Sequence, residues 1–136
     1  MAAHPDRVVR AAVPVRYVEV RDVPDEVPSS FPALEARVGS LRGRRFLAAF
    51  SPEEGWYRAC VQSRPDASEA ESSLPEMEVP GGAYLRVRLR GEPPALYDEI
   101  APAFRLLEDS AERDPTRPAL ELYRREGEVD VLMPVR

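Results

Sequence analysis

The chain has 136 residues, of which 43% are hydrophobic and 32% charged, a balance typical of one globular domain or of two small halves sharing a core. Its 24 acidic residues exceed its 19 basic residues, all arginine, and the formal charge of −5 without a long basic run argues against direct nucleic-acid binding. No apolar run approaches the roughly 20 residues that cross a bilayer, and the first residues lack the pattern of a secretory signal.

Cysteine and histidine are nearly absent from the sequence. The single cysteine, Cys60, excludes an internal disulfide and is in keeping with a reducing cytoplasm, which is the predicted location. With one cysteine and one histidine, the usual nitrogen and sulfur ligands of zinc are too few, so no metal and no cofactor is expected. Cys60 stands between Ala59 and Val61 in an apolar stretch, where an inert core thiol is expected.

The first half of the chain predicts strand, helix, strand, strand. Residues 7–20 are rich in valine, although Pro14 argues against a central, fully hydrogen-bonded position. Ser30 is expected to cap a helix that starts directly after it, and Gly43 could end that helix. Residues 44–50 and 56–62 then form two strands around a turn. The apolar stripe of the helix consists of Phe31, Leu34, Val38 and Leu41.

The second half repeats this order after a polar segment, residues 63–76, that reads as a surface linker. Residues 81–91 form a strand in which leucine and valine alternate with arginine. Residues 92–113 form a helix in which Pro102 predicts a kink or a break. Residues 117–135 form two strands joined by a turn at Glu126-Gly127. The buried face of the helix is expected to hold Leu96, Ile100, Ala103, Phe104 and Leu107.

The two halves together predict an α+β fold built by internal duplication. The repeats span about residues 7–62 and 77–136 of one domain covering residues 1–136. Each strand-helix-strand-strand unit is expected to lay its helix on the same face of an antiparallel sheet. Paired in this way, the units leave a central groove between the halves, a usual place for a small ligand.

Three stretches carry a resemblance to a known family: RFLAAFSPEEGWYRACVQ, MEVPGGAYLRVRLRG and PALELYRREGEVDVLMPV. In their order and spacing they resemble the GyrI-like small-molecule-binding family, which includes the gyrase-inhibitory protein and the effector-binding domains of AraC- and MerR-type transcription regulators. The resemblance implies that Glu121 is the family's strand glutamate, in the central groove, where it pairs with cationic aromatic ligands. Tyr123 lies two residues further along the strand and therefore on the same face.

The residues themselves leave other readings of these positions open. Glu121 could equally be a solvent-facing carboxylate paired with Arg124 or Arg125. Tyr123, Trp56 and Tyr84 join Glu121 as the predicted ligand-binding residues, with Trp56 at the groove mouth. The full set of aromatic wall candidates is Trp56, Tyr57, Tyr84, Tyr97 and Tyr123.

Two further groups of side chains are not expected to bind the ligand. The phenylalanines are expected in the core and the arginines of the strand at 81–91 on a solvated face that discourages self-association. These residues are Phe31, Phe46, Phe50, Phe104, Arg86, Arg88 and Arg90.

Three functions follow from the sequence and the resemblance. We expect a module that binds a hydrophobic, aromatic or cationic small molecule as a sensor or sequestering protein. No helix-turn-helix precedes the first strand, so the module is expected to be free-standing or a piece of a larger protein. The resemblance also implies a hydrolase of cyclopropane-containing alkylating natural products, in which Glu121 would be the acid or base; no second acid–base partner is evident, so an enzyme is the minority reading. The third function is a protein-interaction module that inhibits a topoisomerase. No membrane partner is expected.

Overall fold

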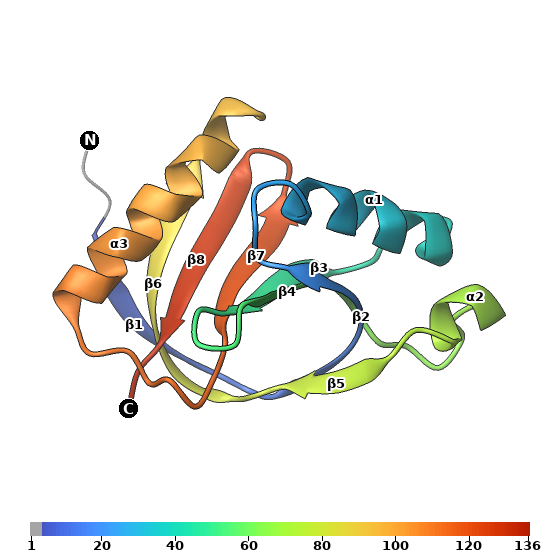
Figure 1. Cartoon of the computed structure of the whole chain (residues 1–136), viewed down its shortest axis with the longest axis horizontal. Coiled ribbons are helices and arrows are strands. Elements are labelled where there is room, and N and C mark those ends of the chain that lie inside the picture. Colours follow the sequence, from blue (N-terminus) through green and yellow to red (C-terminus); the bar gives the residue numbers. More distant parts are fainter. Residues whose placement is uncertain (1–3) are drawn as a thin grey trace.

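The computed structural model describes residues 4–136 and forms one antiparallel sheet of eight strands with helices packed against it (Figure 1). Within these residues no helix is both long and apolar enough to span a membrane. The strand order across the sheet is β1-β6-β8-β7-β3-β4-β2-β5. The elements are β1 (Asp6–Arg10), β2 (Val13–Arg21), α1 (Val27–Val38), β3 (Phe46–Ser51), β4 (Trp56–Gln62), α2 (Glu69–Ser72), β5 (Glu76–Val79), β6 (Gly82–Arg90), the 3-10 helix η1 (Ala95–Glu99), α3 (Ile100–Ser110), β7 (Ala119–Arg125) and β8 (Glu128–Pro134).

The strand order confirms the predicted α+β fold with two equivalent units. In the first unit the sheet runs β2-β4-β3, and in the second it runs β6-β8-β7. The units meet where β3 pairs with β7 in the centre of the sheet. The helix of each unit packs on its own outer strands, α1 on β2 and β4 and α3 on β6 and β8, and both helices lie on the same face. The centre of that face, over β3 and β7, is therefore left between the helices.

The two outermost strands are exchanged between the units. β1 precedes β2 in the chain but pairs with β6, in a register that sets Val8 opposite Tyr84. β5 precedes β6 but pairs with β2, in a register that sets Val15 opposite Met77. In Figure 1 the segments that carry these strands run along one side of the curled sheet. Each unit thus supplies the edge strand of the other.

Apolar side chains are buried on both faces of the sheet, because the exchanged strands curl it around a second core. On the helix face, Val87, Val131 and Leu107 are fully buried between β6, β8 and α3. The core on the other face consists of Val15, Leu47, Ala49, Cys60, Val79, Tyr84, Leu120 and Leu132. Because neighbouring residues of a strand point to opposite faces, successive side chains of the central strands alternate between the two sides of the sheet.

Helix α1 begins earlier than the sequence predicts. It starts at Val27, and Ser30 lies inside its first turns, where the hydroxyl donates to the Val27 carbonyl at 2.7 Å. Proline is well suited to the first turn because its missing N–H has no partner there, and Pro28 fills that role. Gly39, with φ of 78°, ends the helix before Gly43. Leu41 consequently lies beyond the helix and is exposed.

The helix predicted over residues 92–113 is divided into η1 and α3, with α3 beginning at Ile100. Pro102 lies in the first turn of α3, where its lack of an N–H removes no hydrogen bond from the helix. The predicted interruption is therefore present, two residues before the proline. Leu96, Ala103 and Leu107 are buried as expected.

Residues 63–76, predicted to be a polar linker, contain α2 and the first residue of β5. The Ser68 hydroxyl caps α2 by accepting from the Glu71 N–H at 3.2 Å. The segment is held by a buried ion pair between Glu71 and Arg44 and by Leu74, which packs in the core beneath α1. The arginines of β6 are likewise paired: Arg86 with Asp6 at 2.7 Å and Arg88 with Asp130 at 2.8 Å, so this strand face is less solvated than predicted.

Candidate functional site

A groove of about 720 Å³ lies on the helix face of the sheet, between α1 and the η1–α3 segment. Its floor comes from the central strands, which contribute Phe46, Glu121 and Tyr123. This is the position between the two units at which the duplication predicts a ligand site. Its walls are formed by Asp22, Val27, Pro28, Phe31, Glu35, Tyr57, Tyr97, Ile100 and Ala101.

Glu121 lies at the base of this groove with 7% of its surface exposed. One carboxylate oxygen, Oε1, accepts hydrogen bonds from the hydroxyls of Tyr57, at 3.0 Å, and Tyr123. Within residues 4–136, neither of these bonds nor any other side-chain bond reaches Oε2. Arg124 and Arg125, the partners considered for an exposed Glu121, pair with Glu128 instead, at 3.4 and 3.3 Å.

Burial raises the pKa of Glu121 above its ordinary value of 4.5. The two tyrosine hydroxyls oppose this shift because they donate hydrogen bonds to the charged carboxylate. Burial, followed by the charge of Glu121, also raises the pKa of Tyr57 and of Tyr123, so both phenols remain protonated donors. The site is a carboxyl group whose ionisation is costly without a positive partner.

Aromatic rings line the groove around this carboxyl group. The ring of Tyr123 meets Phe31 edge to face, with 5.2 Å between centroids, and Tyr97 in the same manner at 6.3 Å. Phe31 also meets Phe46, at 6.5 Å. Edge-to-face contacts leave ring faces and edges open at angles to one another, which suits an aromatic guest.

The charges that line the groove are of one sign. Asp22, Glu35 and Glu121 contribute carboxyl groups, and among residues 4–136 no arginine lines the groove. Arg105 borders a smaller cavity of about 260 Å³ next to α3, which shares Asp22, Tyr57 and Glu121 with the groove. A concave site with low-dielectric walls concentrates the field of such charges, and here that field favours cations.

Trp56 does not line the groove, contrary to the prediction. It starts β4 one residue before Tyr57, and neighbouring residues of a strand point to opposite faces. Its ring packs with the core on the other face, and the Arg58 guanidinium lies 4.0 Å from the ring centroid. Tyr57 takes the place in the groove that was predicted for Trp56.

Tyr84 is also on the wrong face for the groove. It is fully buried in the core opposite the helices, where its hydroxyl donates to the Pro80 carbonyl at 2.6 Å. Val87 and Leu89 of the same strand face α3, and Tyr84 is an odd number of positions away from both, so strand alternation turns it to the other face. Its predicted ligand role is therefore corrected to a core role.

The groove also contains side chains whose sequence pattern predicted another position or no role. Phe31 and Phe46, expected in the core, are half-buried and line it. Asp22 and Glu35 had no signal in the sequence, because exposed acids are common. Asp22 reaches the groove from the end of β2 and Glu35 from α1. Knowledge of how β4 pairs with β3 would have shown which of its residues face the groove. The prediction would then have named Tyr57 as a groove residue in place of Trp56.

Cys60 takes no part in this site. It is fully buried in the core on the opposite face of the sheet. Burial raises the pKa of its thiol to about 12, so the group stays protonated and unreactive at neutral pH. The predicted inert role agrees with this position.

No protein-family model and no curated protein matches the chain in sequence. Solved structures do match its fold. An integron cassette protein from the mobile metagenome of Vibrio cholerae is 14% identical, with a TM-score of 0.72 over 97% of this chain and 95% of that one. The EcmrR C-terminal domain is 14% identical, with a TM-score of 0.67 over 100% and 99%.

The protein SAV2435, solved bound to tetraphenylphosphonium, is 14% identical, with a TM-score of 0.63 over 100% of this chain and 94% of that one. These likenesses extend over nearly the whole length of both partners. They agree with the observed fold. The chain thus has the fold of the GyrI-like domains, which its sequence resembles.

Proposed function

We propose that this protein binds a lipophilic cation with aromatic groups in the groove between its two units, as a sensor or sequestering module. The observation that carries the proposal is the state of Glu121. Its carboxyl group is buried in a cavity, only one of its oxygens is hydrogen-bonded, and among residues 4–136 no basic side chain lines the cavity. A cationic ligand would provide the positive charge that the ionised carboxylate lacks.

The size and lining of the groove support the same class of ligand. Its volume of about 720 Å³ is suited to a drug-sized molecule. Rings at its walls attract a cation by about 0.5–2 kcal/mol each, in addition to the area that they bury. The structural relative SAV2435 was solved with tetraphenylphosphonium, a cation that carries four aromatic rings.

Isothermal titration calorimetry with tetraphenylphosphonium tests the proposal. Tetraphenylborate has the same shape and the opposite charge, so it separates charge recognition from apolar fit. We expect saturable binding of the phosphonium and none of the borate in the groove. Glu121→Gln should weaken phosphonium binding by about tenfold or more, since a desolvated charge contact contributes about 1.5–3 kcal/mol.

Glu108→Gln provides the matched control. It removes one negative charge from the exposed face of α3 without touching the groove, so it should leave the affinity within about twofold. Equal affinity for the phosphonium in wild type and Glu121→Gln would contradict the proposal, as would borate binding that Glu121→Gln strengthens or weakens.

A hydrolase is the second candidate, and the raised pKa of Glu121 favours it. Burial raises the pKa of the Glu121 carboxyl group, so it holds its proton more tightly than an ordinary glutamate, as a general acid requires. Tyr57 and Tyr123 would then orient the acid or a substrate oxygen. Mass spectrometry of candidate electrophilic substrates after incubation distinguishes the two functions, because a binder returns its ligand unchanged and a hydrolase adds water to it.

A further inference from the structure

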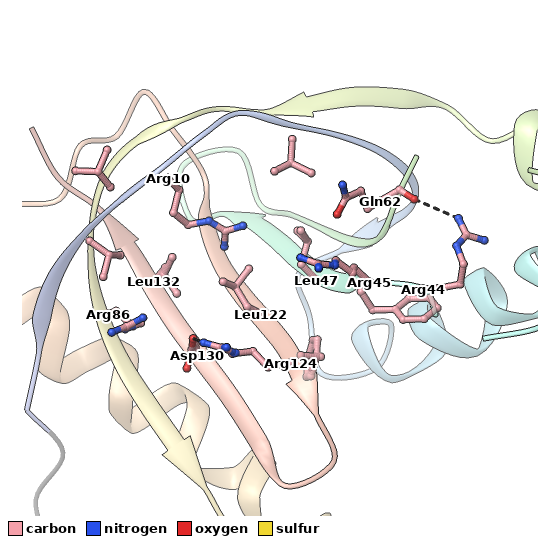
Figure 2. A pocket seen from close by; sticks show the side chains of 15 residues that line it. Arg10, Arg44, Arg45, Leu47, Gln62, Arg86, Leu122, Arg124, Asp130 and Leu132 are labelled. Atoms are coloured by element: carbon pink, nitrogen blue, oxygen red, sulfur yellow. Dashed lines mark hydrogen bonds and ion pairs between the residues drawn. The ribbon is translucent and has the colours of Figure 1, made fainter. Parts of the chain in front are cut away.

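A second cavity, of about 650 Å³, lies on the other face of the sheet (Figure 2). We call it the arginine cavity, after Arg10, Arg44, Arg45, Arg86 and Arg124, which line it. Its floor includes Leu47, Leu122 and Leu132, and these leucines point away from the groove because they belong to the core opposite the helices. The exchanged strand β1 and the start of β2 form one side of it.

The charge of this cavity is the reverse of that of the groove. Asp130 is the only acidic residue that lines it within residues 4–136, against five arginines. Asp130 is already bound by Arg88, which donates from two nitrogens at 2.8 and 3.1 Å. It therefore has little capacity left to neutralise the lining arginines.

Three of the five arginines have partners in the protein. Arg44 pairs with Glu71 at 2.6 Å and Arg86 with Asp6 at 2.7 Å. Arg124 makes two longer contacts, 3.4 Å to Glu128 and 3.5 Å to Asp130. Within residues 4–136, Arg10 and Arg45 form no ion pair, and Figure 2 shows both guanidinium groups extending into the space above the leucine floor.

Of these two residues, Arg10 gives the stronger evidence for an anion site. Its Nη1 is buried and has no hydrogen-bond partner in the described part of the chain. Nearly all buried donors in proteins are paired with protein groups, water or ligands, and a bound acceptor would complete this one. Burial also lowers the pKa of Arg10, although the charges of Tyr84 and Asp130 oppose this shift. A bound anion would provide an acceptor for Nη1 and offset the cost of burying the guanidinium.

The floor determines what kind of anion fits. Val8 and Val13 join the three leucines, so the cavity offers an apolar surface beneath a charged rim. An inorganic anion would leave this apolar surface exposed to water. An arginine fork binds the paired oxygens of a carboxylate or a phosphate, with the rest of the ligand on the apolar floor.

We propose that the arginine cavity binds an organic anion, an apolar body that ends in a carboxylate or a phosphate, with Arg10 and Arg45 as its anchors. This proposal does not depend on the function proposed for the groove. Glu121 of β7 faces the groove and Leu122 faces the arginine cavity, while Phe46 and Tyr123 border both cavities. The protein would then carry sites of opposite charge preference on the two faces of one sheet.

Four probes with the same ten-carbon tail test the charge preference: decanoate, decyl phosphate, decan-1-ol and decyltrimethylammonium. Each is titrated into the full chain by calorimetry below its micelle-forming concentration. We expect saturable binding of decanoate or decyl phosphate, at least tenfold tighter than decanol, as a charge-assisted hydrogen bond predicts. The tighter of the two anions identifies the head group as carboxylate or phosphate.

Variants then assign the binding to this cavity. Arg10→Gln and Arg45→Gln should each weaken the preferred anion by about tenfold. Arg42→Gln is the control, because it removes the same charge from an exposed residue that does not line the cavity. Glu121→Gln should leave anion binding unchanged while it weakens phosphonium binding in the groove, so that failure of one proposal is distinguishable from failure of the other.

Equal binding of decanol and of both anions would overturn the proposal, as would unchanged anion affinity in both arginine variants. Arg45 is exposed, so its variant keeps the test valid even where Arg10→Gln disturbs folding. Amide chemical shifts provide a second measurement. Decanoate or decyl phosphate should shift the signals of Arg10, Leu47 and Leu122, and shifts confined to the groove residues would place the anion elsewhere.

Discussion

The guanidinium of Arg44 and the carboxylate of Glu71 form a two-armed ion pair inside the protein, with 2.6 Å on both arms. The exposed fractions of the two side chains are 2% and 1%. Arg44 precedes β3 and also donates to the Gln62 carbonyl at 3.2 Å, so the pair fastens α2 to the sheet. Together with Leu74, which is buried in the core beneath α1, it holds residues 63–76 against the sheet.

Loss of one member of this pair should be strongly destabilising. Glu71→Ala leaves a buried guanidinium without its partner, and we expect the free energy of unfolding in urea to fall by about 3–5 kcal/mol. Glu69→Ala, two residues earlier at an exposed position, should change it by less than about 0.5 kcal/mol. The double variant Arg44→Met, Glu71→Leu should recover much of the loss. Similar losses for Glu71→Ala and Glu69→Ala would contradict this account.

The same pair should contribute to unfolding in acid. The hydrogen bonds from Arg44 lower the pKa of Glu71 below its ordinary 4.5. A carboxyl group with a lowered folded-state pKa stabilises the fold at neutral pH, and this contribution is lost as the pH falls through the folded-state pKa. We expect the difference in unfolding free energy between wild type and Glu71→Gln to be constant near pH 7 and to shrink below pH 4.5. A difference that grows in acid would show the opposite linkage.

Tyr57→Phe should raise the pKa of Glu121 further. The Tyr57 hydroxyl donates to Oε1 at 3.0 Å and so favours the charged carboxylate, a stabilisation that phenylalanine cannot supply. A carbon-13 NMR titration of the glutamate carboxyl signals measures the shift. Tyr97→Phe removes a hydroxyl from the groove wall that makes no hydrogen bond to Glu121, and it should leave the titration unchanged.

Affinity for a cationic ligand should rise with pH in the range where Glu121 ionises. Burial raises the pKa of Glu121 above 4.5, so protonation competes with the cation below the folded-state value. Because the folded state holds this proton more tightly, Glu121 stabilises the empty protein at low pH, and that contribution is lost as the pH rises through the folded-state pKa. Calorimetry in buffers of different ionisation enthalpy should detect proton release on binding of tetraphenylphosphonium. In Glu121→Gln both the pH dependence and the proton release should vanish.

Tyr97→Leu should weaken binding of tetraphenylphosphonium without affecting the fold. Tyr97 lines the groove and meets Tyr123 edge to face, yet 48% of it is exposed, so little packing is lost. The lost aromatic contact is worth about 0.5–1 kcal/mol at an exposed site, or a few-fold in affinity. The melting temperature should change by no more than a few degrees. An unchanged affinity would remove Tyr97 from the ligand wall.

Periodic patterns predicted most of this fold but did not determine to which face of the sheet each side chain points. Alternation in β6 and the repeat of strand, helix, strand, strand were visible in the sequence, and both are present. Trp56 and Tyr84 were placed in the groove because aromatic residues suit ligand sites, but a shift of one position along a strand turns a side chain to the other core. Only the pairing of distant strands decides which residue of each neighbouring pair faces the ligand.

Contacts between distant segments account for the remaining differences. α2 depends on the Arg44–Glu71 pair, across 27 positions, and short polar helices of this kind have no apolar signature. The arginine cavity was likewise not evident, because Arg10 and Arg45 come together only when β1 crosses to the other unit. A single charged residue in a sequence does not indicate which distant residues will lie beside it in the fold.

The exchange of β1 and β5 makes the single chain equivalent to a domain-swapped dimer whose two subunits have been joined. Each unit gives its first strand to the other, so a unit expressed alone would present β2 or β6 with an unpaired edge. Such an edge recruits another strand, and a second copy of the same unit carries the strand that fits. Isolated halves should therefore form dimers, and the joined chain keeps both exchanged strands within one molecule at high effective concentration.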